Sequence, residues 1–334
     1  MSETTQRRLQ ILKSHLHLDN STRTNQLVQN ESNGLVSFAF KTWAQKPQPQ
    51  HITENGKAIL VTGAAGGLGS DLCLELLKKG CKVFACDLKT EYLEKAFEGV
   101  SKQNLIFIEM DVSNPESVNA AADNVKEQLQ GNKLFAIVNN AGVGSVPGSR
   151  MMKALVEHNE SEMRSMFDVN VLGTIRVTNA LYPLLTKSKT DKDASGVVVN
   201  IASVAGLLGI PYGSYYSASK FAVVGYSDSL RRELASVGVR VGCVEPGFTK
   251  TAFLKPYEVD DNSEFAKQTT RRHKIMKKWT DDAQDPEEVT KAIMSAIFTT
   301  PCPEHQLVDK AKYKTINKML FQYFPYYISD KMMV

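Results

Sequence analysis

Histidine and cysteine are scarce in this sequence, and neither is grouped in the way that metal ligands usually are. None of the six histidines has a second histidine, a cysteine or a carboxylate at zinc-ligand spacing on a recognisable element, so we expect no metal site. The five cysteines form no CxxC pair, and four of them lie inside apolar runs such as CKVFAC and VGCVEP. This pattern predicts buried thiols in a reducing compartment.

Long apolar runs and blocks of like charge are missing as well. The longest apolar run of the first fifty residues, around residues 34–40, is too short to span a bilayer or to form a signal-peptide core. The 40 basic and 36 acidic residues are mixed along the chain, whereas nucleic-acid binding needs clustered lysine and arginine. We therefore expect a cytoplasmic protein with no transmembrane segment and no nucleic-acid partner. Arg7 and Arg8 leave a mitochondrial transit peptide as the alternative, against which Glu3 and Asp19 weigh.

The composition changes along the chain and predicts three parts. Residues 1–55 are rich in glutamine, asparagine, serine and threonine and contain KPQPQH, which predicts a flexible polar extension. Residues 56–310 are expected to form the ordered domain. Within it, residues 248–285 are polar, charged and aromatic by turns, which predicts an irregular segment that covers a substrate. Residues 311–334 form an aromatic-rich tail that packs on the domain or contacts a partner or membrane surface.

From Lys57 onward, short apolar runs alternate with helical stretches. The helical stretches include residues 114–130, 162–185 and 212–236, and the apolar runs are KAILVT, CKVFACD, NLIFIEMD, KLFAIVNN, GVVVNIAS and VRVGCVEP. Short, wholly apolar runs separated by helices of ten or more residues are typical of parallel strands buried on both faces. The sequence therefore predicts an α/β fold, a single doubly wound Rossmann-type parallel sheet with helices on both faces.

A glycine-rich turn, VTGAAGGLG at residues 61–69, lies between the first apolar run and the first helix. Glycines there allow positive φ angles and close backbone approach, so the amides that begin the helix can face a pyrophosphate. Asp87 ends the next strand, where a carboxylate can accept hydrogen bonds from an adenosine ribose. The same carboxylate would repel a 2′-phosphate, so we expect NAD to be preferred over NADP, although Lys89 acts against this preference.

Further motifs follow in a fixed order, and together they resemble those of the short-chain dehydrogenase/reductase family from Lys57 to about Pro301. They are TGAAGGLG for the family's TGxxxGxG, NNAG, the asparagine of VNVLG, the serine of NIAS, YSASK for YxxxK, and PGFTKT after the sixth strand. The resemblance implies hydride transfer between NAD or NADP and an alcohol or ketone. It also implies a homodimer or homotetramer.

Two adjacent tyrosines precede the lysine in SYYSASK. Residues i and i+4 of a helix lie on one face, so Tyr216 is aligned with Lys220, and Tyr215 points about 100° away. An ammonium beside a phenol favours the phenolate, and a free tyrosine has a pKa near 10. Bringing this pKa near neutral requires a change of about 3 pH units, or about 4 kcal/mol, which the lysine and a cationic nicotinamide ring would supply together.

The family resemblance implies a catalytic set of Asn170, Ser203, Tyr216 and Lys220. Tyr216 would exchange a proton with the substrate oxygen, and Ser203 would hydrogen-bond the same oxygen. Lys220 would also bind the nicotinamide ribose, and Asn170 would support a proton relay through water.

Strand-end positions and family motifs together give the candidate contacts. Asp111 closes the third strand, where a carboxylate would meet the adenine amino group, and NNAG closes the fourth. The candidate substrate contacts are Ser203, Leu208 and Tyr216. The candidate cofactor contacts are Thr62, Gly63, Gly67, Leu68, Gly69, Asp87, Asp111, Val112, Asn139, Ala141, Tyr216, Lys220, Pro246, Gly247, Thr249 and Thr251.

The substrate class follows from a closer resemblance. FDVNVLGTIRVTNALYPLL and DPEEVTKAIMSAIFTTPCPEH are similar to family members that act on retinoids and 17β-hydroxysteroids, which implies an apolar alcohol or ketone. Four apolar residues lie between Ser203 and Tyr216, namely Leu207, Leu208, Ile210 and Pro211. Contact with an apolar substrate and packing in the core explain them equally well. The alternative function is a catalytically silent or non-redox nucleotide-binding protein on the same fold. A catalytically silent protein would be expected to lack the tyrosine, the lysine or the serine, so their presence favours an enzyme. A non-redox isomerase or dehydratase would still hold NAD but would show no net reduction of it.

Overall fold

The computed structural model describes residues 49–145, 159–185, 196–251, 253 and 262–310. The chain divides into two units, Met1–Gln50 and His51–Val334. Nearly all of the predicted N-terminal extension and the whole of the predicted tail, residues 311–334, lie outside the described residues. Along the described part of the chain, no helix combines the length and the apolar character needed to cross a membrane.

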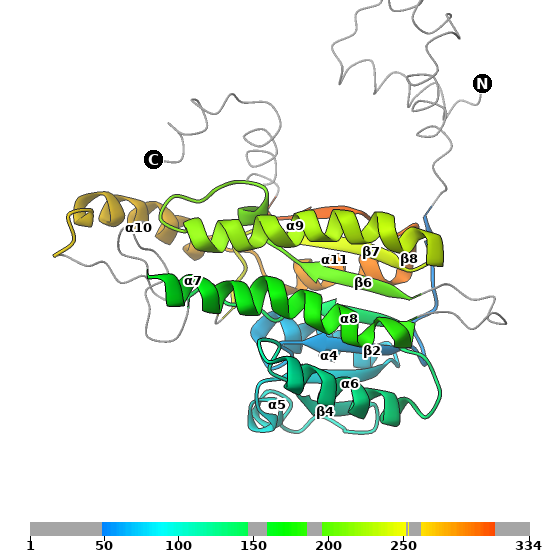
Figure 1. Cartoon of the computed structure of the whole chain (residues 1–334). Coiled ribbons are helices and arrows are strands. Elements are labelled where there is room, and N and C mark those ends of the chain that lie inside the picture. The colour runs from blue at the N-terminus through cyan, green and yellow to red at the C-terminus, as the bar shows by residue number, and fades with distance from the viewer. Residues whose placement is uncertain (1–48, 146–158, 186–195, 252, 254–261, 311–334) are drawn as a thin grey trace, which may run out of the picture. The chain divides into compact units, whose positions relative to one another are not determined.

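A seven-stranded parallel sheet forms the centre of the second unit, in the order β4-β3-β2-β5-β6-β7-β9 (Figure 1). The chain starts in the middle at β2, winds outward to β4, and then returns to β5 on the other side of β2. The polarity of the winding therefore reverses between β2 and β5, where ligands bind in open α/β sheets. The strands are β2 (Ala58–Thr62), β3 (Lys82–Asp87), β4 (Leu105–Glu109), β5 (Ala136–Asn139), β6 (Val197–Ile201), β7 (Arg240–Pro246) and β9 (His305–Val308).

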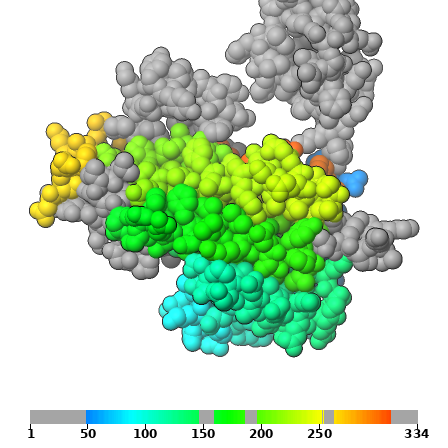
Figure 2. Space-filling model, viewed as in Figure 1, coloured from blue at the N-terminus to red at the C-terminus, as the bar shows by residue number. Residues whose placement is uncertain are grey.

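Helices cover both faces of the sheet, which confirms the predicted doubly wound fold (Figure 1). One apolar cluster joins the sheet to α4 and α11, and another joins it to α6, α8 and α9. Figure 2 shows the helices of the second group side by side on the visible face. The helices are α4 (Gly67–Lys78), α5 (Thr90–Ala96), α6 (Pro115–Leu129), α7 (Glu160–Phe167), α8 (Thr174–Leu185), α9 (Ser214–Leu234), α10 (Ala266–Asp281) and α11 (Pro286–Phe298).

The central strands are mostly apolar because each packs against both helix layers. In β2, Ile59 and Val61 belong to the cluster with α4, whereas Ala58 and Leu60 belong to the cluster with α6. Successive side chains of a strand point to opposite faces, so both faces favour apolar residues here. The remaining short elements are β1 (Gln50–His51), β8 (Thr299–Thr300), η2 (Asp168–Gly173), η3 (Val204–Gly206) and η4 (Ala235–Val237).

Three local features differ from the sequence-based expectation. The helix expected over residues 162–185 is divided into α7, the π-helix η2 and α8. The segment 248–285 is not irregular throughout, because α10 occupies its second half. Only Thr269, Arg272 and Met276 of α10 are buried, so this strongly basic helix lacks the apolar stripe by which helices are predicted. The four-residue edge strand β9 was not predicted either, since its side chains are only partly buried.

Candidate active site

A cavity of about 800 Å³ opens at the carboxyl ends of the parallel strands. It is lined by the segments that follow β2, β3, β5, β6 and β7. These include the segments after β2 and β5, the two strands between which the winding reverses. Four predicted site residues, Thr62, Asn139, Asn170 and Leu208, are not part of its lining. The predicted residues that line it are Gly63, Gly67, Leu68, Gly69, Asp87, Asp111, Val112, Ala141, Ser203, Tyr216, Lys220, Pro246, Gly247, Thr249 and Thr251.

The glycine-rich turn has no room for a side chain at Gly63 or Gly69 and is tight at Gly67. Gly63 has a φ of +62°, and a Cβ atom on it would lie 2.9 Å from the Cα atom of Ala141. A Cβ atom on Gly69 would collide with the Gly63 carbonyl oxygen, and one on Gly67 would lie 3.1 Å from Cβ of Thr251. The turn is thus a bare backbone surface that leads into the N-terminus of α4, which suits a pyrophosphate.

Two carboxylates extend this surface along the cavity. Asp87, at the end of β3, accepts hydrogen bonds from the backbone amides of Ala65 and Leu88, both at 2.9 Å. Asp111 accepts from the amide of Ser113 at 2.8 Å and from its hydroxyl at 2.6 Å. Both carboxylates are therefore held in place before any ligand binds. The cationic side chain on this part of the cavity wall is Lys95 and not Lys89.

Thr62 and Asn139 support the cavity from behind. The Thr62 hydroxyl accepts hydrogen bonds from the amides of Asn140 at 3.1 Å and Ala141 at 3.0 Å, which joins the ends of β2 and β5. The Asn139 side chain is buried and donates to Thr178 at 2.9 Å and to Asn200 at 2.8 Å. The neighbouring Asn140 lines the cavity instead, and its side chain donates to the carbonyl of Thr62 at 2.9 Å.

Ser203, Tyr216 and Lys220 meet at the other end of the cavity. Ser203 lies just beyond the end of β6, whereas Tyr216 and Lys220 lie one turn apart in the first half of α9. The Lys220 ammonium nitrogen lies 5.9 Å from the centre of the Tyr216 ring and donates to the carbonyl oxygen of Ile201 at 2.9 Å. Tyr215 is not part of the cavity lining. The cavity thus holds a hydroxyl, a phenol and an ammonium beside a backbone surface that suits a dinucleotide.

Comparison with known proteins decides the family, because a model of the short chain dehydrogenase family matches residues 57–262. The chain belongs to the short-chain dehydrogenase family. Human retinol dehydrogenase 16 is 34% identical over 261 residues, which cover 75% of this chain and 77% of the human protein. Rat 17-beta-hydroxysteroid dehydrogenase type 6 is 31% identical over 279 residues, which cover 82% of this chain and 83% of the rat protein.

A solved structure of a short-chain dehydrogenase from Streptomyces avermitilis matches with a TM-score of 0.65 and 28% sequence identity, covering 79% of this chain and 92% of that one. These similarities confirm the family predicted from the sequence motifs and its proximity to members named for retinol and hydroxysteroids. As a member of this family, the protein is an NAD(P)-dependent oxidoreductase.

The electrostatics of the dehydrogenase differ from the sequence-based expectation for the tyrosine. Burial raises the pKa of Tyr216 to about 12, and a hydrogen bond with Ser203 acts in the opposite direction. Burial also lowers the pKa of Lys220 to about 8. In the protein alone, the loss of solvation of the phenol therefore outweighs the attraction of the nearby ammonium, which is directed at the carbonyl of Ile201.

Asn170 anchors α9, the helix that carries Tyr216 and Lys220, from outside the cavity. Its amide oxygen accepts from the Val143 amide at 2.8 Å, and its amide nitrogen donates to the Val143 carbonyl at 2.9 Å and to the Ser219 hydroxyl at 3.0 Å. It thereby joins the segment after β5 to α9. A Cβ atom on Gly142 would lie 3.3 Å from the Asn170 oxygen and 3.4 Å from the Lys220 nitrogen. Because glycine has no Cβ atom, the space beside Gly142 is open to both of these polar groups. Asn170 lies within the π-helix η2, and such bulges are frequent at functional sites.

The remaining walls near Tyr216 are apolar. Ile210 lines the cavity in place of Leu208. Phe248, Phe253 and Met276 contribute from the segment after β7, and the Phe253 ring packs 5.9 Å from that of Tyr216. The aromatic content of residues 248–285 gave a signal for the two phenylalanines, whereas Met276 was missed because α10 was not predicted.

Proposed function

We propose that this dehydrogenase transfers a hydride between NAD and an apolar alcohol, or the corresponding ketone or aldehyde, of the steroid or retinoid kind. Tyr216 is the proton donor and acceptor in this proposal. The observation that carries it is the placement of Ser203 and Tyr216 on the wall of the cavity that also contains the bare glycine turn. Proton handling and nucleotide binding therefore share one space.

The residues present fit the dinucleotide that the family implies. Gly63 and Gly69 have no room for a Cβ atom, so the bare backbone of residues 63–69 would hold the pyrophosphate, and Asp87 would accept hydrogen bonds from the adenosine ribose. The Asp87 carboxylate favours NAD, while Lys95 on the same wall moderates that preference. When bound, NAD supplies the hydride acceptor and NADH the hydride donor.

The side chains around the substrate handle its proton. In reduction, the Tyr216 phenol donates its proton to the substrate oxygen while the Ser203 hydroxyl donates a hydrogen bond to the same oxygen. The high pKa of Tyr216 keeps the phenol protonated and ready to donate at neutral pH. In oxidation, the phenol first loses its proton and then accepts one from the alcohol, a step that the ammonium of Lys220 supports. Asn170 keeps α9 in place for this exchange through Ser219.

The substrate class rests on the apolar wall and on the relatives. Ile210, Phe248, Phe253 and Met276 add carbon surface to the cavity wall, which favours an apolar ligand. The names of the human and rat relatives refer to retinol and to a 17β-hydroxysteroid. Both kinds of compound are apolar alcohols.

The test is a panel of retinol and hydroxysteroids with NAD and with NADP, and of the matching carbonyl compounds with the reduced nucleotides. Absorbance of the reduced nicotinamide reports turnover, and the same panel with a Tyr216→Phe variant is the control. We expect turnover of at least one apolar alcohol, more efficient with NAD than with NADP. Nucleotide binding without turnover of any alcohol or carbonyl compound would refute the proposal and favour a catalytically silent or non-redox protein.

A further inference from the structure

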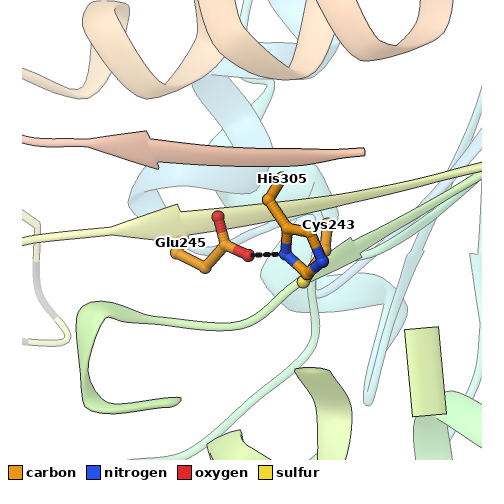
Figure 3. Close-up of side chains that lie close together, drawn as sticks. All are labelled: Cys243, Glu245 and His305. Carbon is orange, nitrogen blue, oxygen red and sulfur yellow. Dashed lines mark hydrogen bonds and ion pairs between the residues drawn. The ribbon is translucent and has the colours of Figure 1, made fainter. Parts of the chain in front are cut away.

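Three potential metal ligands meet on one face of the sheet, and none of them lines the cavity (Figure 3). Cys243 and Glu245 are two residues apart on β7, so their side chains point to the same face. His305, on the edge strand β9, is the cross-strand partner of Cys243. One ligand atom from each side chain lies within 4.8 Å of those of the other two.

The carboxylate of this cluster is not fully satisfied. Glu245 is 0% exposed, and its Oε1 atom lies 2.6 Å from Nδ1 of His305. Its second oxygen, Oε2, is buried and accepts no hydrogen bond from a nitrogen or oxygen atom of the described residues, so the Cys243 thiol is the other group that interacts with this carboxylate. A buried carboxylate oxygen without a nitrogen or oxygen donor is costly and rare in folded proteins, and a bound cation would remove that cost.

We propose that Cys243, Glu245 and His305 bind one zinc ion through Sγ, a carboxylate oxygen and Nδ1. Sulfur, oxygen and nitrogen are the three donor atoms that zinc takes in proteins, and water would complete the tetrahedron. Zinc–ligand bonds of about 2.0–2.3 Å place ligand atoms roughly 3.3–3.7 Å apart in a tetrahedron. The three atoms already lie within 4.8 Å of one another. Side-chain rotations that move these atoms by about an ångström would therefore form the site, and the backbone pairing of β7 with β9 would stay in place.

Charge balance permits this exchange in a buried place. Without metal, a carboxylate beside a protonated imidazole is neutral overall, and so is a zinc ion bound by a carboxylate, a thiolate and a neutral imidazole. Zinc therefore replaces two protons, one from the Cys243 thiol and one from the imidazole ring, and both are released to solvent. No net charge is added to the interior, which limits the desolvation penalty.

A further carboxylate and an entry path support the site. Oδ1 of Asp228, on α9, lies 3.2 Å from Nε2 of His305 and 3.1 Å from Arg231. A zinc-bound histidine usually donates its other ring N–H to such a carboxylate, which fixes the ring orientation. The His305 side chain is 37% exposed, so an ion would reach the buried Glu245 past the imidazole.

The site would be structural. Its ligands are not part of the cavity lining, but Glu245 directly precedes Pro246 and Gly247, which are. An ion that joins β7 to β9 would therefore hold this part of the cavity wall. Local spacing in the sequence indicated no metal site, because His305 lies sixty residues beyond Glu245 and approaches it only through the pairing of the two strands.

Cobalt(II), a spectroscopic substitute for zinc, tests the proposal on the full chain after treatment with a chelator. We expect one cobalt ion per chain, with visible bands of a four-coordinate ion and a near-ultraviolet sulfur-to-cobalt charge-transfer band, and displacement of cobalt by zinc. Cys243→Ser should remove the charge-transfer band, and Asp228→Asn should weaken zinc binding about 10–100-fold. Cys302→Ser, which changes a partly buried cysteine outside the cluster, is the matched control and should change neither.

The wild-type titration decides the matter even where a variant fails to fold. If the wild-type protein shows no charge-transfer band on cobalt titration, the proposal is wrong and the cluster is only a buried histidine–glutamate pair. A band that persists in folded Cys243→Ser would place the metal elsewhere and would overturn the proposal as well.

Discussion

Replacing Tyr216 with phenylalanine isolates the proton step, because it removes one oxygen atom and leaves the ring. The remaining ring would keep its packing against Phe253, whose centre lies 5.9 Å away, while the hydrogen bond with Ser203 would be lost. A positioned general acid or base contributes about 10²–10⁴-fold to the rate, which is about 3–5.5 kcal/mol in activation free energy. We therefore expect kcat to fall by at least about 100-fold.

Nucleotide binding should change far less than turnover in this variant. The glycine turn and Asp87 lie on other walls of the cavity and keep their geometry. The most that the nucleotide would lose is one neutral hydrogen bond, worth about 0.5–1.5 kcal/mol, or up to about tenfold in Kd. Steady-state absorbance with the best substrate of the panel gives kcat, and calorimetric titration with NAD gives Kd.

Tyr215→Phe is the matched control, since it makes the same chemical change one residue earlier in the same helix. Tyr215 is not part of the cavity lining, so its kcat should stay within about twofold of wild type. The assignment is refuted if Tyr216→Phe keeps more than a tenth of the wild-type kcat, or if Tyr215→Phe is the more damaging change. Equal losses of kcat and of nucleotide affinity would indicate a structural role.

Three other predictions follow from the same geometry. Asp87→Ser removes a charged acceptor worth about 1.5–3 kcal/mol, so Kd for NAD should rise about 10–100-fold, and an unchanged ratio of kcat/KM for NADP and NAD would contradict this role. Gly69→Ala places a Cβ atom 2.8 Å from Cα of Ala64 and should abolish NAD binding. Gly225→Ala makes the same change in open space on α9, so it should raise the free energy of unfolding in urea by up to about 1 kcal/mol. Because the pKa of Lys220 is lowered to about 8, its ammonium is lost as pH rises through that value. The kcat/KM for NADH in reduction, which reports the nucleotide-free enzyme, should therefore fall above about pH 8, and a level profile up to pH 10 would count against a role for the ammonium.

The sheet was predictable because burial on both faces leaves a strong pattern. A strand that is buried on both faces, such as β6, is apolar at nearly every position, and the apolar runs of the sequence matched six of the seven strands for this reason. The exception in β6 is Asn200, whose side chain is satisfied by hydrogen bonds with Asn139 and Ser227. The helix α10 and the edge strand β9 lie at the surface, where burial imposes no such pattern. They were missed on that physical ground.

Site residues were predictable where their position in a turn or at a strand end decides whether they line the cavity. They were less predictable where the direction of the side chain decides it. Gly63 and Asp87 are fixed by the turn and by the strand end, and both line the cavity as expected. In the pair Asn139–Asn140, the motif does not reveal which amide points inward. A strand alternates its faces, so Asn139, the last residue of β5, points into the core, and Asn140 beyond the strand end reaches the cavity.

The tyrosine and the lysine also show what spacing alone leaves undecided. One helical turn places Lys220 near Tyr216, but the burial that gives the pair its position also disfavours charge on each group. With a pKa raised to about 12, the phenol is protonated at pH 7 in the protein alone. The protein by itself is therefore arranged as a proton donor, which serves reduction directly. Oxidation requires additional positive charge near the phenol, and the oxidised nicotinamide ring carries that charge, so the ability of the pair to act as a base depends on nucleotide binding.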